Sequence, residues 1–186
     1  MKRAKKVGGI AARCSSSQTE VDANAFRAAM RHFVGSVSVV TTWHDGRPWG
    51  MTINSFTSIC MDPPTILVCL NSKTVTAADV RDFGRFAVNL LSQDQRHLSE
   101  VCSRPNGDKY VDEHVLPAER VLGANGIPKV RDASVVFTCR TVEQLIVGSH
   151  LVAIAAIESI DAPGPRPPLL YGHGRYMHGI DLEARA

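Results

Sequence analysis

The sequence predicts a mainly β protein, an antiparallel barrel with peripheral helices. Three observations indicate this class: many short segments are patterned as strands, turn residues such as Asp45-Gly46 separate neighbouring segments, and few helical patterns lie between them. No GxGxxG motif follows a predicted strand, which argues against a Rossmann domain. With 186 residues, 44% of them hydrophobic, the chain is long enough and apolar enough for one folded domain.

The first folded segment is predicted to be a helix. Asp22 or Asn24 can cap its first turn, and Phe26, Met30 and Phe33 recur at i, i+4 and i+7, so they share one face. We expect this apolar face to pack on a sheet.

Two-residue periodicity follows and predicts a hairpin. The outgoing strand begins at Ser36, turns at Asp45-Gly46 and returns from Trp49 to Phe56. Asp62-Pro63-Pro64 should then block further pairing, and the continuously apolar segment from Ile66 to Leu70 is typical of a strand covered on both faces.

The later elements are predicted in this order: a helix over 74–83, a strand over 86–90, a short helix over 94–101, a polar connection over 103–133, strands over 134–147 and 150–160, and a final strand over 169–177. The connection is longer than ordinary loops, so we expect it to be functional or partly helical. Tyr171 and Tyr176 are an odd number of residues apart on the final strand, so they should point to opposite faces, and at most one can line a given pocket.

Residues 1–20 are predicted to be a disordered basic tail. Five of the 21 basic residues of the chain lie there, among Gly and Ser residues. Removing these five leaves 16 basic against 18 acidic residues, so the formal charge of +3 becomes about −2 for the rest of the chain. Nucleic-acid binding through the tail is therefore a weak third hypothesis, and we expect no nucleic-acid partner.

The sequence predicts a cytoplasmic protein without a membrane partner. No stretch reaches the roughly 18 apolar residues that a membrane span needs, and the apolar stretch after Lys6 is too short for a signal peptide. The five cysteines form an odd count without a CxxC pair, which is typical of free thiols in a reducing compartment.

Common catalytic and metal-binding motifs are absent from the sequence, which has no GxSxG, Walker or HExxH pattern. His150, His173 and His178 are candidate metal ligands, but scattered histidines more often satisfy local hydrogen bonds, so no metal site is predicted.

The most informative segment runs from Gly50 to Pro64. It carries Thr52, Asn54, Ser55, Thr57 and Ser58 within seven residues. Such hydroxyl and amide groups on one strand can bind a polar ligand, including a phosphate or ring carbonyls, or they can form the solvated face of an edge strand. The pattern alone leaves both interpretations open.

Several motifs match one protein family in order and spacing over residues 24–177. They are Phe26-Arg27 to Gly35, Val39-Val40-Thr41-Thr42, the segment from Gly50 to Ser58, Asp62-Pro63-Pro64, Leu67 to Asn71, Phe86 to Leu91, Gly126-Ile127-Pro128, Gly148-Ser149-His150, Pro168 to Tyr171 and Gly174-Arg175-Tyr176. On these motifs the chain closely resembles the short-chain flavin reductases that serve two-component flavin monooxygenases.

This resemblance implies a fold and an activity. The fold is an antiparallel split β-barrel of the Greek-key, FMN-binding type over residues 21–180, followed by a short C-terminal tail over 181–186. The implied protein is a homodimer with flavin sites near the subunit interface. It reduces FMN or FAD with NADH or NADPH and supplies diffusible reduced flavin to a separate oxygenase component.

The resemblance also implies the site residues. The strand around Val37 to Thr41 and the segment from Met51 to Ser58 would hold the isoalloxazine and the ribityl chain, and Asn71 to Lys73 would lie near the flavin phosphate. Gly148-Ser149-His150 stands where the family has Gly-Asp-His, with His150 positioning the nicotinamide. The implied cofactor-binding residues are Val37, Ser38, Val39, Val40, Thr41, Met51, Thr52, Ile53, Asn54, Ser55, Phe56, Thr57, Ser58, Asn71, Ser72, Lys73, Gly148, Ser149 and His150.

No acid or base catalyst is required, because hydride transfer between two cofactors is the cofactors' own chemistry. Alternatives remain for single residues: Lys73 can be an ordinary exposed lysine, and His150 can cap the adjacent strand. Ser149 replaces the acidic member of the family triplet. A module that stores or senses flavin without fast turnover is therefore the alternative function.

Overall fold

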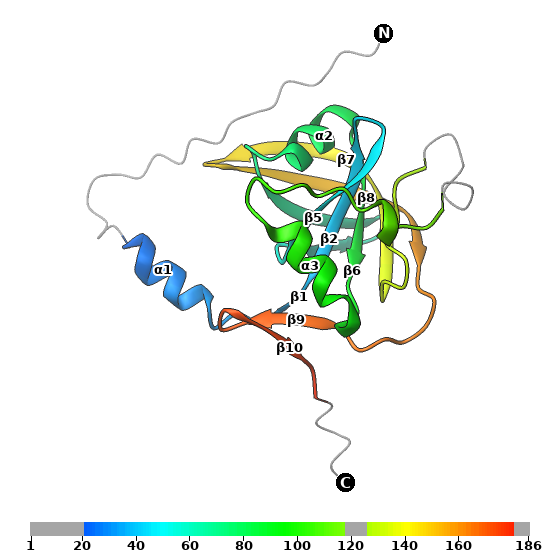
Figure 1. Ribbon diagram of the computed structural model, residues 1–186. Coiled ribbons are helices and arrows are strands. Elements are labelled where there is room, and N and C mark those ends of the chain that lie inside the picture. Colours follow the sequence, from blue (N-terminus) through cyan, green and yellow to red (C-terminus); the bar gives the residue numbers. More distant parts are fainter. Residues whose placement is uncertain (1–20, 118–125, 181–186) are drawn as a thin grey trace.

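The computed structural model describes residues 21–117 and 126–180, and the predicted tails over 1–20 and 181–186 lie outside the described residues (Figure 1). Three helices are present in the described part: α1 (Ala23–Met30), α2 (Val75–Phe83) and α3 (Arg96–Ser103). The strands are β1 (Gly35–Ser36), β2 (Ser38–His44), β3 (Arg47–Ile53), β4 (Thr57–Met61), β5 (Pro64–Asn71), β6 (Arg85–Leu90), β7 (Val135–Val147), β8 (His150–Asp161), β9 (Leu169–Gly172) and β10 (Arg175–His178). The predicted mainly β class with peripheral helices is confirmed.

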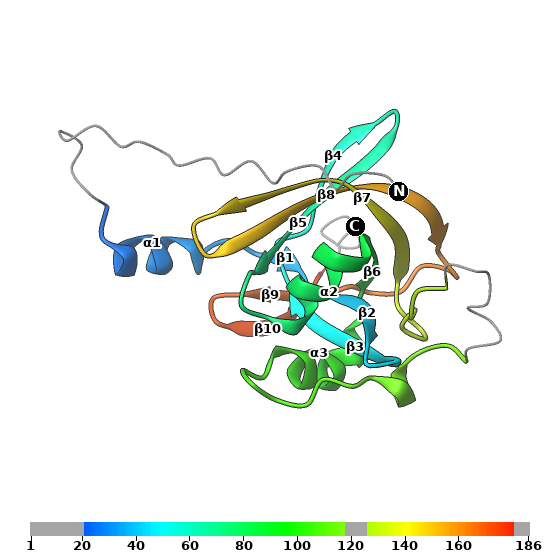
Figure 2. The same cartoon turned by 90° about the horizontal axis from the view of Figure 1, so that it is seen from above.

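The strands form two antiparallel sheets. Seven strands pair in the order β3-β2-β6-β7-β8-β5-β4, and three pair in the order β1-β9-β10. Figures 1 and 2 show the larger sheet curving around a core, with α2 and α3 on its outside and the β9–β10 hairpin beside β1. No helix in the described ranges is long and apolar enough to span a membrane.

The core divides into two clusters because successive side chains along β2 point to opposite faces of the sheet. Val37 and Val39 belong to the cluster that α3 covers with Leu98 and Cys102, whereas Val40 belongs to the cluster that α2 closes with Val80. The two-residue periodicity seen in the sequence therefore fixes which side of β2 meets which helix.

Most predicted elements are found close to their expected ranges. The Asp45-Gly46 turn joins β2 to β3, and both residues have a positive φ, as a tight hairpin turn requires. Thr74 caps α2 by accepting a hydrogen bond from the main-chain N–H of Ala77 at 3.3 Å.

Two expectations about strands are wrong. Asp62-Pro63-Pro64 does not block pairing, because these residues form the tip of the β4–β5 hairpin, in which Met61 pairs with Pro64. The final strand over 169–177 is two strands, because His173 and Gly174 adopt positive φ values of 52° and 75° and reverse the chain. The sequence pattern shows the apolar residues of both strands but hides this two-residue turn.

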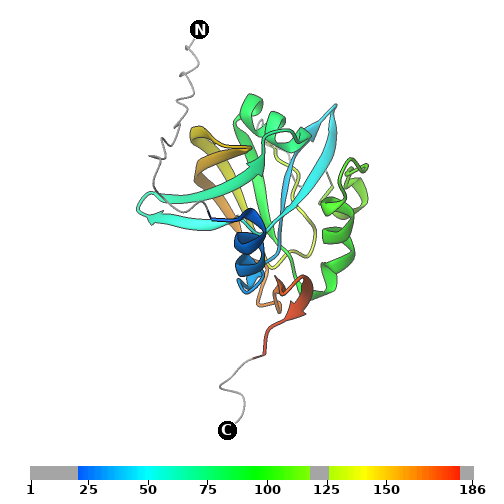
Figure 3. The same ribbon diagram turned by 90° about the vertical axis from the view of Figure 1, so that its left-hand side faces the viewer.

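The predicted N-terminal helix forms as α1, but its apolar face does not pack on a sheet of its own chain. No residue of α1 is buried, and Phe26, Met30 and Phe33 are 61%, 48% and 57% exposed. Figures 2 and 3 show that α1 and the β4–β5 hairpin project from the body of the molecule.

The long connection is partly ordered against β2 and β3. It contains a short 3-10 helix over Asp112–His114, and the main-chain N–H of Gly50 donates to the carbonyl of Lys109 at 2.9 Å. The expectation of partial helix is confirmed in its described part, and residues 118–125 lie outside the described residues.

Candidate functional site

The segment after β3 is fixed between α3 and β5. The hydroxyl of Thr52 donates to the carbonyl of Ser99 in α3 at 2.7 Å. The hydroxyl of Ser55 donates to the carbonyl of Cys69 in β5 at 2.7 Å and accepts from the N–H of Cys69 at 3.3 Å. These bonds use two of the predicted polar side chains to hold the segment in place.

The other side chains of the segment divide into packed and exposed groups. Phe56 stacks on Phe137 with ring centroids 5.7 Å apart, so it belongs to the core. Asn54, Thr57 and Ser58 are exposed. The side chains of Asn54, Thr57 and Ser58 are therefore open to solvent.

A hollow of about 220 Å³ opens beside the end of β3. It is lined by Val37, Thr52, Ile53, Asn54, Ser103, Tyr171 and Tyr176. The first four were predicted from the sequence as site residues. Ser103 and the two tyrosines were not. Gly172 and Gly174 are the only local signal of the hairpin that carries the tyrosines, and the alternating pattern of the flanking strands outweighs it.

The two tyrosines share one face of the β9–β10 hairpin, so the expectation that they point to opposite faces is wrong. Tyr171 and Tyr176 are direct cross-strand partners, and their ring centroids are 5.4 Å apart. Cross-strand partners project from the same face of a sheet. The unrecognised turn between them caused the error.

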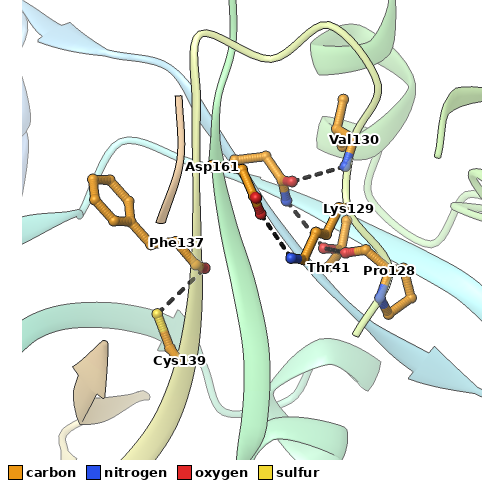
Figure 4. A network of polar contacts seen from close by, with 8 residues as sticks. Thr41, Pro128, Lys129, Val130, Phe137, Cys139 and Asp161 are labelled. Atoms are coloured by element: carbon orange, nitrogen blue, oxygen red, sulfur yellow. Dashed lines mark hydrogen bonds and ion pairs between the residues drawn. The ribbon is translucent and has the colours of Figure 1, made fainter. Parts of the chain in front are cut away.

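Most side chains of the predicted strand from Val37 to Thr41 lie in the core beneath the site and do not line the hollow. Only Val37 reaches the hollow, and the side chains of Val39 and Val40 are fully buried in the two core clusters. Thr41 donates to the carbonyl of Pro128 and accepts from the side-chain amide of Asn89 at 3.0 Å (Figure 4). Ser38 is also fully buried.

A second group of predicted residues gathers at the end of β5. The main-chain N–H and the hydroxyl of Ser72 both donate to the carbonyl of Ser149, at 2.9 and 3.0 Å. Asn71 pairs with His150 across β5 and β8. The turn over Asn71–Lys73 and the turn over Gly148–His150 therefore lie side by side, as one unit.

This paired turn presents groups that suit an anion and an aromatic ring. Lys73 is exposed and directly precedes Thr74, the cap of α2, so it stands at the N-terminal, positive end of the helix dipole. The hydroxyl of Ser149 lies 3.1 Å from Nδ1 of the exposed His150, which fixes the orientation of the imidazole.

The two groups of residues are connected through β5. Ser55 is bound to Cys69, which lies two residues before Asn71. The segment after β3 and the paired turn are therefore both attached to the same end of β5. We define the candidate site as Thr52 to Ser55, the hollow, Asn71–Lys73 and Gly148–His150.

Two thiols, those of Cys69 and Cys102, lie near the site. Burial raises the pKa of Cys102, which lies under Gly50, to about 12, and burial also raises the pKa of Cys69. A thiol with a raised pKa is a poor nucleophile at neutral pH.

Two other hollows, of about 360 and 660 Å³, contain no predicted site residue.

Comparison with known protein families gives one assignment. A family model described as "Flavin reductase like domain" matches residues 30–179. The reductase component of 4-nitrophenol 4-monooxygenase/4-nitrocatechol 2-monooxygenase from Rhodococcus opacus is 38% identical over 160 residues, 86% of this chain and 83% of that protein. The NADH-dependent flavin reductase of Pseudomonas fluorescens is 34% identical over 88% of this chain and 93% of that protein.

Solved structures agree in fold. The styrene monooxygenase flavin reductase from Pseudomonas putida superposes with a TM-score of 0.72 at 31% identity, over 83% of this chain and 97% of that one. An NADH:FAD oxidoreductase from Streptomyces globisporus, in complex with NAD and FAD fragments, superposes with a TM-score of 0.75 at 26% identity, over 88% of this chain and 95% of that one.

Proposed function

The chain belongs to the family of flavin reductase-like domains, and on this premise we propose that it is an NADH-dependent flavin reductase that supplies reduced flavin to a separate monooxygenase component. One observation of the fold supports this function most: Ser72 bonds to Ser149, and Ser55 bonds to Cys69 on the strand that leads to Asn71, so three segments far apart in sequence gather at the end of β5. The fold of the chain is the antiparallel split barrel of its relatives.

The chemistry of the site fits a flavin. A flavin combines a largely apolar ring, a polar ring edge and a phosphate. The hollow offers apolar walls at Val37 and Ile53 and polar groups at Thr52 and Asn54. The paired turn offers the Lys73 ammonium and the helix N-terminus for the phosphate.

The protein residues bind and orient, and none needs to act as an acid or a base. A bound flavin accepts a hydride from NADH and carries the electrons away when it leaves the enzyme. Asn54 and the main-chain N–H groups beside it would donate hydrogen bonds to the ring edge. His150, held by Ser149, would lie against the nicotinamide, and alignment of the two rings supplies most of the acceleration.

The names of the relatives support the donor and the partner. The relative from Pseudomonas fluorescens is described as NADH-dependent, and the relative from Rhodococcus opacus is the reductase component of a monooxygenase. We therefore infer that NADH is preferred over NADPH and that reduced FMN or FAD passes to an oxygenase encoded as a separate chain.

We further propose that the enzyme is a homodimer. The exposed apolar residues Phe26, Met30, Ile59 and Met61 lie on α1 and β4, the two elements that project from the body of the molecule. Apolar surface of this kind marks an interaction site. The four cysteines in the described part of the chain are all free, which accords with a cytoplasmic location.

The function is tested by a steady-state assay that crosses FMN and FAD with NADH and NADPH. Oxidation of the nucleotide is followed by its absorbance, with and without added flavin. We expect flavin-dependent turnover with NADH and slower turnover with NADPH. A protein that retains flavin through gel filtration and oxidises neither nucleotide would instead be a storage or sensing module.

A further inference from the structure

The pair of tyrosines on the β9–β10 hairpin plays no part in the function proposed above. Tyr171 and Tyr176 face each other across the hairpin, with their ring planes at 71° in an edge-to-face arrangement. Both line the hollow beside the end of β3. The hairpin therefore supplies an aromatic wall to the candidate site.

The two rings differ in how they are held. The hydroxyl of Tyr176 lies 2.9 Å from the hydroxyl of the buried Ser99, and the ring packs against the core cluster covered by α3. Tyr171 is 36% exposed and contacts the ring of Tyr176. Tyr176 is thus the anchored member of the pair, and Tyr171 is the member whose ring is available to a ligand.

The hollow has the size and lining of a site for one ring system. Its volume of about 220 Å³ is below the roughly 300–1,000 Å³ of pockets that enclose a whole drug-sized ligand. Val37, Ile53 and the two tyrosine rings give it apolar walls, and Thr52, Asn54 and Ser103 give it a polar side. The carbon-rich, methyl-bearing end of an isoalloxazine suits the apolar walls, and the polar edge of the same ring suits the polar side.

The position of the hollow agrees with this occupant. Thr52 and Asn54 line it, and Ser55 connects their segment to β5, which ends at the turn that carries Lys73. A flavin with its phosphate at Lys73 and its ring along Thr52–Asn54 directs the far end of the ring toward the tyrosines.

We propose that Tyr171 stacks against the dimethylbenzene end of the flavin ring and that Tyr176 is a positioning residue that holds Tyr171 in place through its edge-to-face contact. This inference rests on the proposed function and adds a ring-binding wall to it. Aromatic stacking of this kind strengthens ring binding severalfold without hydrogen bonds.

Riboflavin is the probe that isolates this contact, because it has the ring and no phosphate. Full-length enzyme is titrated into riboflavin and the flavin fluorescence is followed for the wild type, Tyr171→Ala, Tyr171→Leu and Tyr171→Phe. We expect the Kd to rise about ten-fold for Tyr171→Ala and nearly as much for Tyr171→Leu, which keeps apolar volume without an aromatic ring. Tyr171→Phe should retain wild-type affinity.

Steady-state kinetics provide the second readout. The flavin KM of Tyr171→Ala should rise in proportion to the riboflavin Kd, with the KM for NADH unchanged. Tyr176→Phe, which loses the contact with Ser99, should raise the riboflavin Kd by a smaller factor, and its thermal midpoint should fall because the buried hydroxyl of Ser99 loses a partner. An unchanged riboflavin Kd in Tyr171→Ala, or a rise confined to the KM for NADH, overturns the inference. Flavin-dependent NADH oxidation by the wild type would still uphold the proposed function in both cases.

Discussion

The hydroxyl of Ser72 donates to the main-chain carbonyl of Ser149 at 3.0 Å, which joins the turn after β5 to the turn between β7 and β8. The two turns are 77 residues apart in sequence. One carries the cation that we assign to the flavin phosphate and the other carries the imidazole that we assign to the nicotinamide. The contact therefore fixes the two turns relative to each other.

Lys73→Ala is expected to weaken FMN binding through the phosphate alone. Removal of an exposed cation facing an anion costs up to about 1 kcal/mol, or about five-fold in KM. We expect this rise for FMN and none for riboflavin, measured by steady-state NADH oxidation. Arg81→Ala, which removes a positive charge from the last turn of the same helix, is the matched control. Equal effects on FMN and riboflavin would show that Lys73 does not bind the phosphate.

His150→Ala is expected to raise the KM for NADH by more than it raises the KM for flavin. The imidazole is exposed and oriented by Ser149, so its loss removes a contact with the nucleotide rather than part of the core. Ser149→Ala keeps the imidazole and removes its 3.1 Å contact, and it should have a smaller effect in the same direction. An unchanged KM for NADH in His150→Ala would remove this residue from the nucleotide site.

The sequence predicted elements whose patterns are local and failed where a feature depends on distant contacts. The helical segment over 74–83 and the Asp45-Gly46 turn are local patterns, and α2 and the β2–β3 hairpin were placed correctly. The exposure of Phe26 was not predicted, because a helical pattern shows that a face is apolar but not what covers it.

The same distinction holds for the candidate site. The hydroxyl-rich segment is a local pattern visible in the sequence. Only the fold shows that the hydroxyl of Ser55 bonds to the main chain of Cys69, whereas the side chain of Asn54 is exposed. The wall formed by Tyr171 and Tyr176 depends on a turn at two residues of positive φ, which the alternating pattern of the flanking strands conceals.

Asn89→Ala is expected to destabilise the fold strongly. The side-chain amide of this fully buried residue donates to the carbonyl of Val39 at 2.8 Å and to the hydroxyl of Thr41 at 3.0 Å, and its oxygen accepts from the N–H of Val130 at 2.8 Å. Thr41 and Val130, both labelled in Figure 4, therefore share Asn89 as a hydrogen-bond partner.

Truncation leaves these groups buried without partners, at about 1–3 kcal/mol each. We therefore expect the free energy of unfolding, measured in urea, to fall by about 3 kcal/mol or more. Gln93→Ala, at an exposed position shortly after the end of β6, should change the free energy of unfolding by less than about 0.5 kcal/mol. A loss no larger than this control would contradict the role given to Asn89.

Asp79→Asn is expected to stabilise the protein at neutral pH. Asp79 is a buried residue of α2, and this burial raises its pKa above the usual value of 3.8. The hydrogen bond and the charge of His44 lower the pKa in part, and the nearby Asp45 and Asp82 raise it. A carboxyl group with a raised folded-state pKa contributes stability below the unfolded pKa and loses it as pH rises through the folded pKa.

The ionised carboxylate is therefore a cost at pH 7 that an amide of the same shape avoids. We expect the thermal midpoint of Asp79→Asn to exceed that of the wild type by about 2–4 °C at pH 7, and the difference to shrink toward pH 4. Asp82→Asn, at an exposed position on the same helix, should leave the midpoint nearly unchanged. A lower midpoint for Asp79→Asn at pH 7 would mean that the contact with His44 outweighs the burial of the charge.

The double variant Phe26→Ser/Met30→Ser is expected to convert the proposed dimer into a monomer. Both side chains are exposed on α1, a helix without a buried residue, and an eight-residue helix is not stable in water by itself. Its apolar face therefore needs a covering surface, which we assign to a second copy of the chain. Sedimentation of the wild type should give twice the chain mass of 20.2 kDa, and the double variant should sediment at the chain mass.

The single variant Arg27→Ser is the matched control, because Arg27 lies on α1 between the two apolar positions in sequence and outside their face. It should sediment with the wild type. A wild type that stays monomeric at micromolar concentration would reject the second copy as the cover of α1. A double variant that remains dimeric would place the interface on β4, where Ile59 and Met61 are 49% and 85% exposed. Serine substitution of these two residues, followed by sedimentation, would then test that interface.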